Sequence, residues 1–360
     1  MNGRRDGVAL ILTLFALLIL AALAAGLLSA SVQSLQIAES VEESFRARTA
    51  AESALRAVVA GWRGGPYRDM AIGEVRALTV ASAGVDPNLA VRVEVERLAN
   101  PLYLLRARAT TPRGAVARAA LVIRGFGAAE LAARFPAALA TGGPADLRDR
   151  ARVEGFDASA PPPSIDVACL AAAVALLVEA AGAPDRPAQL VVPVDSQGFA
   201  GIGPLGWDDL AAIADRTESG SLLLGPRHVD GGCDEAAAGN WGAPLDPSDP
   251  CAAYAPLIFA PGDLRILGGQ GQGILVVAGD LRLEDDAFFA GPVLVGGRVI
   301  AGDSARIAGA IAAADASGPT TLSGDASVVF DPCAILRAFN AAPALGRALR
   351  PGGRMWVPAF

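Results

Sequence analysis

Four cysteines are the side chains of this chain best suited to covalent or metal chemistry. Cys169, Cys233, Cys251 and Cys333 are spread over the C-terminal two-thirds of the 360 residues and lack the C-x-x-C spacing of a metal or redox motif. In an exported chain, four cysteines permit two disulfides among three pairings. We favour a local Cys233–Cys251 loop, which leaves Cys169 for Cys333, and buried free thiols are the alternative.

The single histidine, His228, lies in the segment RHVDGGCDE. Asp230, Cys233 and Asp234 stand nearby, so the segment resembles part of a metal site or, with a serine, part of a catalytic triad. Two of the four soft ligands of a tetrahedral site are missing, however, which favours a turn residue beside a disulfide cysteine. No nucleophile, base and oxyanion donors assemble elsewhere, so we expect no catalytic residues and no metal.

The segment GIGPLG at residues 201–206 matches the glycine pattern of a dinucleotide-binding loop. Such a loop joins a strand directly to a helix whose N-terminus receives the pyrophosphate. Here Pro204 stiffens the loop, and Asp208 and Asp209 at the start of the next helix would repel phosphate. We therefore expect no cofactor.

Calcium is a second tempting ligand. The segment GGQGQGIL resembles calcium-binding glycine repeats, but Gly273 stands where the liganding aspartate belongs. The acidic run at 284–286 and the pair Asp246 and Asp249 read as solvated turn residues.

The overall charge argues against a nucleic-acid surface. The chain has a net charge of -7, its 30 cations are all arginine, and no basic stripe stands out. Its 41 glycines and 25 prolines indicate short strands with many turns.

An uncharged segment at residues 8–28 is long enough to cross a bilayer. Its 21 residues would form a helix of about 31 Å, close to the thickness of the hydrocarbon core. Arg4 and Arg5 precede it and glutamates from Glu39 onward follow it, which predicts a cytoplasmic N-terminus and an exported body.

No proline or glycine interrupts the next 32 residues, so we expect the helix to continue over residues 8–62 until the glycine-rich GWRGGPY. Its apolar positions predict one stripe along roughly one face of the helix: Leu35, Ala38, Val41, Phe45, Ala51, Leu55 and Val58.

This layout, with Gly7 heading the apolar run and RTAAESALRA later in the helix, resembles type IV pilin-like proteins, especially the PilX-type minor pilins and the related K-type pseudopilin of type II secretion. The resemblance implies a leader at residues 1–7, removed by prepilin peptidase between Gly7 and Val8. It places Leu12, Phe15 and Leu20 in a helix that contacts inner-membrane lipid and then other pilins or pseudopilins.

Two positions depart from the family pattern. Asp6 precedes Gly7, where the family often has a cation, and Leu12 occupies the fifth mature position, where major pilins carry glutamate. Leu12 avoids the cost of a membrane carboxylate of about 2.5–3.5 kcal/mol but forfeits its contact with a neighbouring subunit. Some minor pilins that lack this glutamate are thought to lie at or near the filament tip.

The exported body is expected to be α+β. Alternating residues predict a three-stranded antiparallel sheet over 89–125, within a region spanning 63–125. The resemblance to pilin-like proteins implies that this sheet packs on the apolar stripe of the long helix. Residues 126–255 form a mixed helical and irregular insert, with a buried helix at 167–178 and another starting at Trp207.

Residues 256–331 have a rhythm of short apolar bursts and glycine turns. Gly-Asp recurs at 262, 279, 302 and 324, which favours a solenoid-like β-rich domain over the alternative of an antiparallel sandwich. The triplet Asp-Leu-Arg, shared by residues 146–148 with later repeats, indicates an earlier coil before an insertion at 158–255. A helix and tail at 332–360 complete the chain.

The combined prediction is a minor pilin-like structural subunit of a pilus or pseudopilus in the bacterial inner membrane, or outside the cell within the pilus. The alternative is an uncleaved membrane-tethered periplasmic scaffold, or a solenoid that binds a protein, a surface or a glycan ligand. An exported hydrolase is disfavoured because no carboxylate pair stands out. The first residue of the native chain distinguishes the pilin-like subunit from the uncleaved scaffold: a chain that starts at Val8 supports the subunit, and an intact Met1 supports the scaffold.

Overall fold

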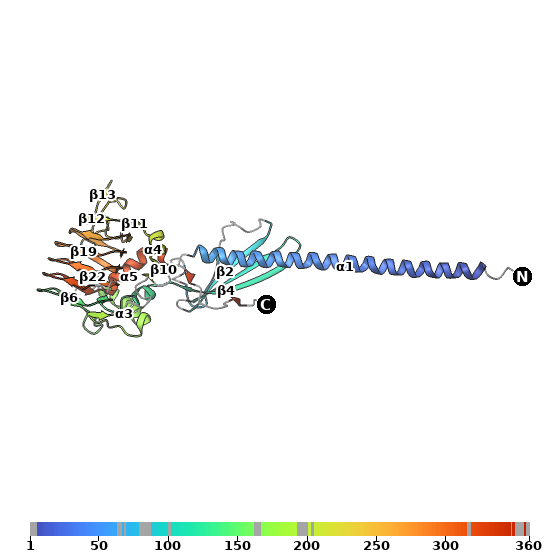
Figure 1. The fold of residues 1–360 in the computed structure, drawn as a ribbon, viewed down its shortest axis with the longest axis horizontal. Helices are drawn as coiled ribbons and strands as arrows, with labels where there is room; N and C mark the ends of the chain where they lie inside the picture. Colours follow the sequence, from blue (N-terminus) through green and yellow to red (C-terminus); the bar gives the residue numbers. More distant parts are fainter. Residues whose placement is uncertain are drawn as a thin grey trace. The chain divides into compact units, whose positions relative to one another are not determined.

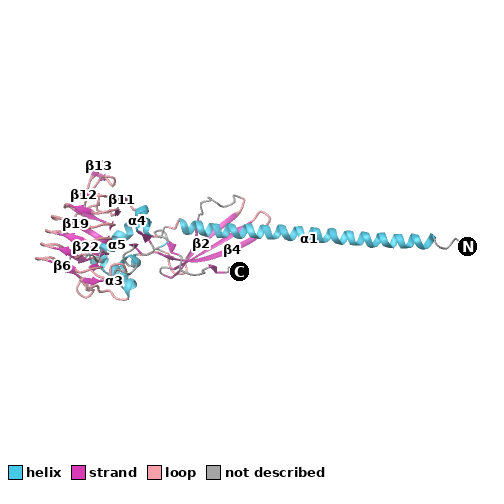
Figure 2. Ribbon diagram, viewed as in Figure 1, coloured by secondary structure: helices cyan, strands magenta, loops and turns pink. Residues whose placement is uncertain are grey.

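The computed structural model describes residues 6–62, 67, 70–78, 88–99, 102–161, 167–192, 201–202, 205–314, 318–346, 348–349 and 356–357. The chain divides into two compact units, and its helices and strands are drawn in Figure 1 and Figure 2. Unit 1 contains Met1–Gly61, Met70–Ile123 and Arg350–Phe360, and unit 2 contains Trp62–Asp69 and Arg124–Leu349.

Unit 1 begins with one continuous helix, α1 (Asp6–Ala60), of 55 residues (Figure 1). It contains no proline, and alanine and leucine, both strong helix formers, dominate it. The N–H of Gly61 still bonds the carbonyl of Ala57, and the glycine-rich segment then ends the helix. The unbroken helix predicted over residues 8–62 is therefore present.

The face of α1 that the sheet covers differs from the predicted stripe. The buried residues are Ala47, Ala50, Ala51, Ala54 and Leu55. Four predicted stripe residues are instead exposed: Leu35, Ala38, Val41 and Phe45. Alanine allows the helix backbone to lie close to the strands it contacts, whereas the larger side chains occupy turns of the helix that the sheet does not cover.

An antiparallel sheet packs on this alanine face in unit 1. Its strands are β1 (Val75–Leu78), β2 (Ala90–Ala99), β3 (Leu102–Thr110) and β4 (Val116–Gly125), in that order. Val93, Val95 and Leu105 point into the core, in keeping with the alternation of apolar and charged residues.

The predicted three strands thus gain neighbours on both sides. β1 pairs with β2, and β26 (Trp356–Val357) pairs with Leu121 and Ala120 of β4. In unit 2, β25 (Ala348–Leu349) pairs with Gly125 and Arg124 at the end of β4. The predicted tail at 332–360 therefore contributes strands, which are too short to show an alternation in the sequence.

Unit 2 is built on two parallel sheets, parts of which are visible in Figure 2. The first sheet runs β11 (Arg216–Thr217), β15 (Leu257–Ala260), β18 (Ile274–Val277), β20 (Phe288–Val295), β22 (Arg306–Ala313), β24 (Ser327–Phe330), β7 (Arg152–Glu154). The second runs β12 (Gly220–Leu222), β16 (Leu264–Ile266), β19 (Leu281–Leu283), β21 (Val299–Ala301), β23 (Thr320–Leu322), β6 (Ala145–Leu147). Every described pairing along these two orders is parallel, so the alternative of an antiparallel sandwich is wrong.

Three further short strands join the first sheet. β17 (Gln270–Gln272) pairs with β20, and β5 (Leu139–Thr141) pairs with both β22 and β8 (Gln189–Val191).

The chain alternates between the two sheets and adds one layer with each pass. Neighbouring strands of the first sheet are offset by 17, 18, 18 and 21 residues, as the pairs Leu257 with Ile274, Leu275 with Val293, Val293 with Ile311 and Ile307 with Val328 show. The Gly-Asp spacing differs because these dipeptides lie at two different corners. Asp263 and Asp280 precede strands of the second sheet, whereas Asp303 and Asp325 precede strands of the first.

The boundaries predicted for this domain are also corrected. The first layer begins with β11 and β12, before residue 256. The segment with the early Asp-Leu-Arg triplet does form a layer, but β6 pairs with β23 and β7 with β24, so it stacks on the last layer. Arg150 and Asp325 join the two with paired hydrogen bonds of 2.5 and 2.7 Å. The position of this layer in the stack therefore does not follow the order of the segments in the sequence.

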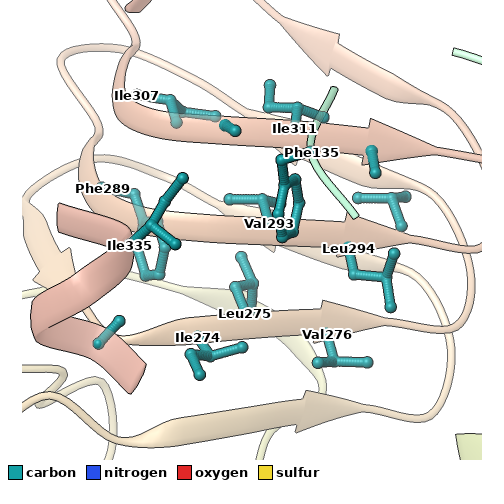
Figure 3. Close-up of a cluster of buried hydrophobic side chains, with 14 of the residues drawn as sticks. Phe135, Ile274, Leu275, Val276, Phe289, Val293, Leu294, Ile307, Ile311 and Ile335 are labelled. Atoms are coloured by element: carbon teal, nitrogen blue, oxygen red, sulfur yellow. The ribbon is translucent and has the colours of Figure 1, made fainter. Parts of the chain in front are cut away.

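Helices cover the first sheet of unit 2. They are α2 (Ala128–Ala132), α3 (Val167–Ala181), α4 (Trp207–Ile213) and α5 (Pro332–Ala341), and a short 3-10 turn (Pro343–Leu345) follows α5. Figure 3 shows Ile335 of α5 and Phe135 in the same buried cluster as Phe289 and Val293 of β20. The strands of this sheet are apolar on both faces because both are buried.

A column of glycines crosses the first sheet. Gly291 of β20 pairs with Gly309 of β22, and their φ angles are +142° and +155°. A Cβ on Gly291 would lie 1.9 Å from the carbonyl oxygen of Gly273, and one on Gly309 would lie 2.0 Å from that of Gly291, so these two layers require glycine where each contacts the previous one.

Candidate functional sites

The apolar half of α1 is exposed on all sides. Leu12, Phe15 and Leu20 are 62%, 63% and 62% exposed, and residues 7–38 carry no charged side chain. Among the described helices, α1 is long and apolar enough to cross a membrane by length and composition. One N-terminal helix thus fits a membrane anchor, and it brings the three predicted residues together on one segment.

The exposed apolar surface continues beyond the length a bilayer core requires. Ile37, Val41 and Phe45 follow one another at intervals of four residues, which places them along one side of the helix. All three are more than 60% exposed. This line of side chains, which we call the outer ridge, has no covering partner among the described residues.

Pairs of oppositely charged side chains lie beside the outer ridge and in the turns of α1 that follow it. Arg46 bonds Glu42 at 2.7 Å, and Glu52 pairs with both Arg48 and Arg56. These pairs at intervals of four residues stabilise the charged, C-terminal half of the helix.

The expected processing positions lie at the start of the helix. Gly7 and Val8 belong to α1, and their side chains lie outside the described residues. Cleavage between them stays a prediction.

Both disulfides have the pairing that the sequence favours. Cys169 of α3 is bonded to Cys333 of α5, and Cys233 is bonded to Cys251. None of the four cysteines is free, so the alternative of buried thiols is wrong. The first bond links two of the helices that cover the first sheet, and the second closes a loop of 18 residues.

The second disulfide lies in a compact loop at residues 225–255, which we call the cap. Within the cap, β13 (His228–Val229) pairs with β14 (Gly232–Cys233), so His228 stands opposite Cys233. His228 Nε2 lies 2.9 Å from Asp249 Oδ1, and the same oxygen accepts a hydrogen bond from the N–H of Cys251 at 2.7 Å. These two hydrogen bonds, first that of His228, lower the pKa of Asp249.

A buried asparagine lies at the centre of the cap. Asn240 Nδ2 donates to the carbonyls of Asp234 at 2.6 Å and Arg227 at 3.2 Å. The same nitrogen lies 3.4 Å from Cys233 Sγ and 3.5 Å from Cys251 Sγ. Its side chain thus connects both sulfurs to the backbone of the cap.

The cap is fastened to the first layers of the two sheets. Gln272 donates from its backbone N–H to the carbonyl of Trp241 at 2.7 Å, and Trp241 Nε1 donates to Glu218 at 3.4 Å. Trp241 also packs edge-on against Phe289. Arg216, which pairs with Glu218 at 2.8 Å, donates to the carbonyl of Glu235. The cap therefore belongs to the fold of unit 2.

The GIGPLG segment does not form a phosphate cradle. Gly201–Ile202 (β9) pairs antiparallel with Leu205–Gly206 (β10), which makes a hairpin. The helix that follows has seven residues, and Asp209 accepts a hydrogen bond from the N–H of Gly206 at 3.2 Å. A side chain of the protein thus occupies the place that a phosphate would take.

The acidic residues considered for calcium have partners of their own. Glu284 accepts two hydrogen bonds from Arg265, at 2.7 and 2.5 Å, which lower its pKa. Asp246 accepts hydrogen bonds from the hydroxyl and N–H of Ser248, which lower its pKa.

An open pocket of about 460 Å³ lies in unit 2 between Glu154, Phe156, Asp157 and Arg186. Arg186 is buried, and burial lowers its pKa. Its guanidinium donates to the carbonyls of Leu177, Ala183 and Asp185, so its charge serves the C-terminal end of α3.

Asp249 and Cys251 were assigned other roles from the sequence and were not placed beside His228. Within the described residues, one group of His, Cys, Asp and Glu side chains is close enough to share a metal ion, and it consists of His228, Asp249 and Cys251. Asp249 and Cys251 come from the far side of the cap, and their separation from His228 leaves no local motif in the sequence.

Comparisons with known proteins add little to this description. No protein-family model matches the chain, and no curated protein matches it. Among solved structures, the crystal structure of the competence-associated pilin ComZ from Thermus thermophilus is similar, at 12% sequence identity and a TM-score of 0.24. The match covers 87% of this chain and 96% of that chain. A TM-score of this size does not establish a shared fold.

Proposed function

We propose that this chain is a minor pilin-like subunit, of the PilX type, that initiates or caps a type IV pilus or a related pseudopilus. The observation that carries the proposal is α1, a single helix that is exposed and apolar at its start and covered by a sheet over Ala47 to Leu55. One rigid element thereby connects a surface that needs a partner to a folded body.

In this proposal, prepilin peptidase cuts after Gly7 and leaves Val8 as the first residue of the mature chain. Residues 8–28 then hold the subunit in the inner membrane, with the N-terminus in the cytoplasm and the body in the periplasm. Extraction into a filament exchanges lipid contacts for contacts with the helices of other pilins or pseudopilins. The energy of apolar burial is similar in both settings, so the exchange is feasible.

The outer ridge supports assembly over a simple anchor. Ile37, Val41 and Phe45 lie 9 to 17 residues beyond Leu28, which at about 1.5 Å per residue is about 13–26 Å outside the apolar run. Each large apolar side chain left in water forgoes about 1.5–3 kcal/mol of burial energy. A neighbouring helix would cover this ridge, whereas a bilayer would not reach most of it.

Leu12 favours a position at the end of the filament. Major pilins are expected to carry a glutamate here that contacts the next subunit, and Leu12, an exposed apolar side chain, offers no such charge. A subunit without that contact suits initiation or capping better than repeated addition.

We further propose that the layered parallel sheets of unit 2 form a β-solenoid that is displayed outward and acts by binding, without catalysis. Its ligand class is a surface or a glycan. The regular layers provide a rigid platform for recognition.

Mass spectrometry of the N-terminus tests the proposal. The full chain is expressed with a prepilin peptidase, extracted from membranes, and measured intact and after proteolysis. We expect a mature chain that starts at Val8, and we expect Gly7→Val to retain Met1, because the resemblance places the cut after a glycine. An intact Met1 in the unaltered chain would instead support an uncleaved, membrane-tethered scaffold.

A further inference from the structure

We propose that the cap holds a divalent metal ion, with Zn²⁺ as the preferred metal, when the Cys233–Cys251 disulfide is reduced. His228, Cys233, Asp249 and Cys251 would be the four ligands. The inference goes beyond the filament proposal and stands independently of it, because it concerns the internal chemistry of unit 2.

Three of the ligand atoms already lie close together. The ligand atoms of His228, Asp249 and Cys251 all lie within 4.8 Å of one another. Tetrahedral zinc with bonds of about 2.0–2.3 Å places its ligand atoms about 3.3–3.8 Å apart. The existing arrangement therefore needs a contraction of about 1 Å to surround an ion.

Cys233 supplies the fourth ligand from the neighbouring strand. It is bonded to Cys251 and stands opposite His228 in the β13–β14 pair. When the sulfurs separate, both remain next to the histidine and the carboxylate. Thiolate, imidazole and carboxylate are all ligands of Zn²⁺, and four ligands give the tetrahedral coordination of a structural zinc site.

A supporting shell around the ligands is also present. Asn240 is fully buried, and its Nδ2 lies within 3.5 Å of both sulfurs, where an N–H group stabilises thiolates. Asp249 is oriented by the N–H of Cys251. Such second contacts hold ligands in place in metal sites, and here they already exist in the disulfide form.

The cap is accessible to the reactants. His228 is exposed and Cys233 is partly exposed, whereas Cys333 of the other disulfide is buried. A dithiol reductant donates two electrons and two protons to the Cys233–Cys251 bond and is itself oxidised to a disulfide. Zn²⁺ then replaces the two thiol protons, which pass to solvent, while neutral His228 and ionised Asp249 complete the site.

The proposal revises the expectation that no metal binds here. That expectation rested on two missing ligands around His228 and Cys233. The fold supplies them as Asp249 and Cys251, which are 21 and 23 residues from the histidine. Metal and disulfide would then be alternative links that hold the same cap on the first layers of unit 2.

Cobalt titration of the full chain in detergent tests the site. The Cys169→Ala/Cys333→Ala variant, which retains the cap disulfide alone, is reduced with a dithiol, freed of reductant under anaerobic conditions and titrated with Co²⁺. We expect one equivalent to bind, with the intense visible absorption of tetrahedral cobalt and a thiolate charge-transfer band. Zn²⁺ should displace the Co²⁺, and the oxidised protein should show neither signal.

Matched variants distinguish the four ligands from their neighbours. We expect Cys233→Ser to remove the part of the charge-transfer absorption that its sulfur contributes. We expect His228→Gln and Asp249→Asn each to weaken Co²⁺ binding at least tenfold. Asp246→Asn is the control within the cap, since this residue bonds Ser248, and we expect its affinity to stay within twofold. Stoichiometric binding that is unchanged by His228→Gln overturns the proposal.

The experiment also tests the proposal when the reduced cap or the double variant does not fold. If the reduced cap unfolds and binds no Co²⁺, the proposal is wrong. If the Cys169→Ala/Cys333→Ala variant itself does not fold, the titration is performed on the fully reduced wild-type chain. Binding there must disappear in Cys233→Ser/Cys251→Ser, and retention in that variant would refute the assignment.

Discussion

The apolar side chains of helix α1 and those of the first sheet of unit 2 differ in their exposure. Leu12 and Phe45 are exposed on the part of α1 that no described residue covers, whereas Val293 and Ile311 are buried between layers of the same chain. Unit 2 thus completes its own core, whereas in the proposed function the exposed part of α1 is covered by lipid or by another protein. This difference supports the proposal that α1 mediates assembly while unit 2 is stable by its own contacts.

The two regions also differ in the range of the contacts that specify them. A helix bonds residues four positions apart, so α1 needs little beyond its composition. From β15 to β24 the layers of unit 2 pair residues 17 to 21 positions apart, and the Arg150–Asp325 contact joins residues separated by 175. Damage to α1 should therefore stay local, while damage to a layer should spread through unit 2.

The sharpest test of this contrast is Gly291→Ala. The new Cβ would lie 1.9 Å from the carbonyl oxygen of Gly273, at a φ of +142° that side chains rarely adopt. Because backbone of the previous layer blocks it, we expect a loss of about 4 kcal/mol or more in the free energy of unfolding of unit 2. Chemical denaturation followed by tryptophan fluorescence measures it, while the helical signal of α1 is retained.

Gly220→Ala is the matched control for that variant. Gly220 also belongs to unit 2 and has a φ of +74°, but nothing lies within 4 Å of its added Cβ. Its cost should be the conformational penalty alone, about 1–2 kcal/mol. Equal losses for the two variants would show that contact between layers does not control the stability of unit 2.

A second pair of variants divides α1 itself. Ala51 is buried against the sheet, so Ala51→Leu should overpack this contact and reduce the stability of unit 1 by about 1–3 kcal/mol. Phe45 is 69% exposed, so Phe45→Ala should leave thermal stability almost unchanged. Circular dichroism of the full chain in detergent compares their melting temperatures.

In an assembly assay the order of the two variants should reverse, with Phe45→Ala showing the larger defect. Phe45→Ala removes part of the outer ridge, and we expect weaker crosslinking to partner pilins in membranes. Ala51→Leu retains the ridge and should crosslink more than Phe45→Ala wherever it folds. Normal crosslinking by Phe45→Ala would argue that the ridge is not an assembly surface.

The sequence was informative where structure is local. Composition and the absence of proline predicted α1, and the alternation around Val93 and Val95 predicted the central strands of unit 1. Of the seven residues predicted for the buried stripe, only Ala51 and Leu55 are buried. The prediction missed the other alanines because alanine carries a weak apolar signal and its importance here comes from close packing. Ala47 and Ala50 are buried for a reason that only the adjacent sheet reveals.

Long-range features could not be predicted in the same way. β11 has two residues and β12 has three, too few for a periodic pattern. The stacking of β6 on β23 depends on a contact across most of unit 2. For the cap, the favoured local disulfide emerged from spacing, but the meeting of Asp249 with His228 depends on how the loop folds back.

The smallest expected effect is the acid response of unit 2. Hydrogen bonds from Arg150 lower the pKa of Asp325, so its folded pKa lies below the unfolded value of about 3.9. Its contribution to stability is present above that unfolded value and is lost as pH falls through the folded pKa. Burial raises the pKa of Asp331, which caps α5, so its folded state gains relative stability as pH falls through that pKa.

The two aspartates should therefore change the pH profile in opposite directions. Urea unfolding of unit 2 between pH 7 and pH 3 should show a shallower acid loss in Asp325→Asn, because the favourable carboxylate is gone. It should show a steeper loss in Asp331→Asn, because the compensating group is removed while asparagine still accepts from the N–H groups of Cys333 and Ala334. Profiles that shift in the same direction would mean that ionisation of these two groups does not govern the acid response. In that case the layers of unit 2 would owe their stability to contacts that pH does not alter. Unit 2 would then differ from α1 in the packing of its apolar side chains alone.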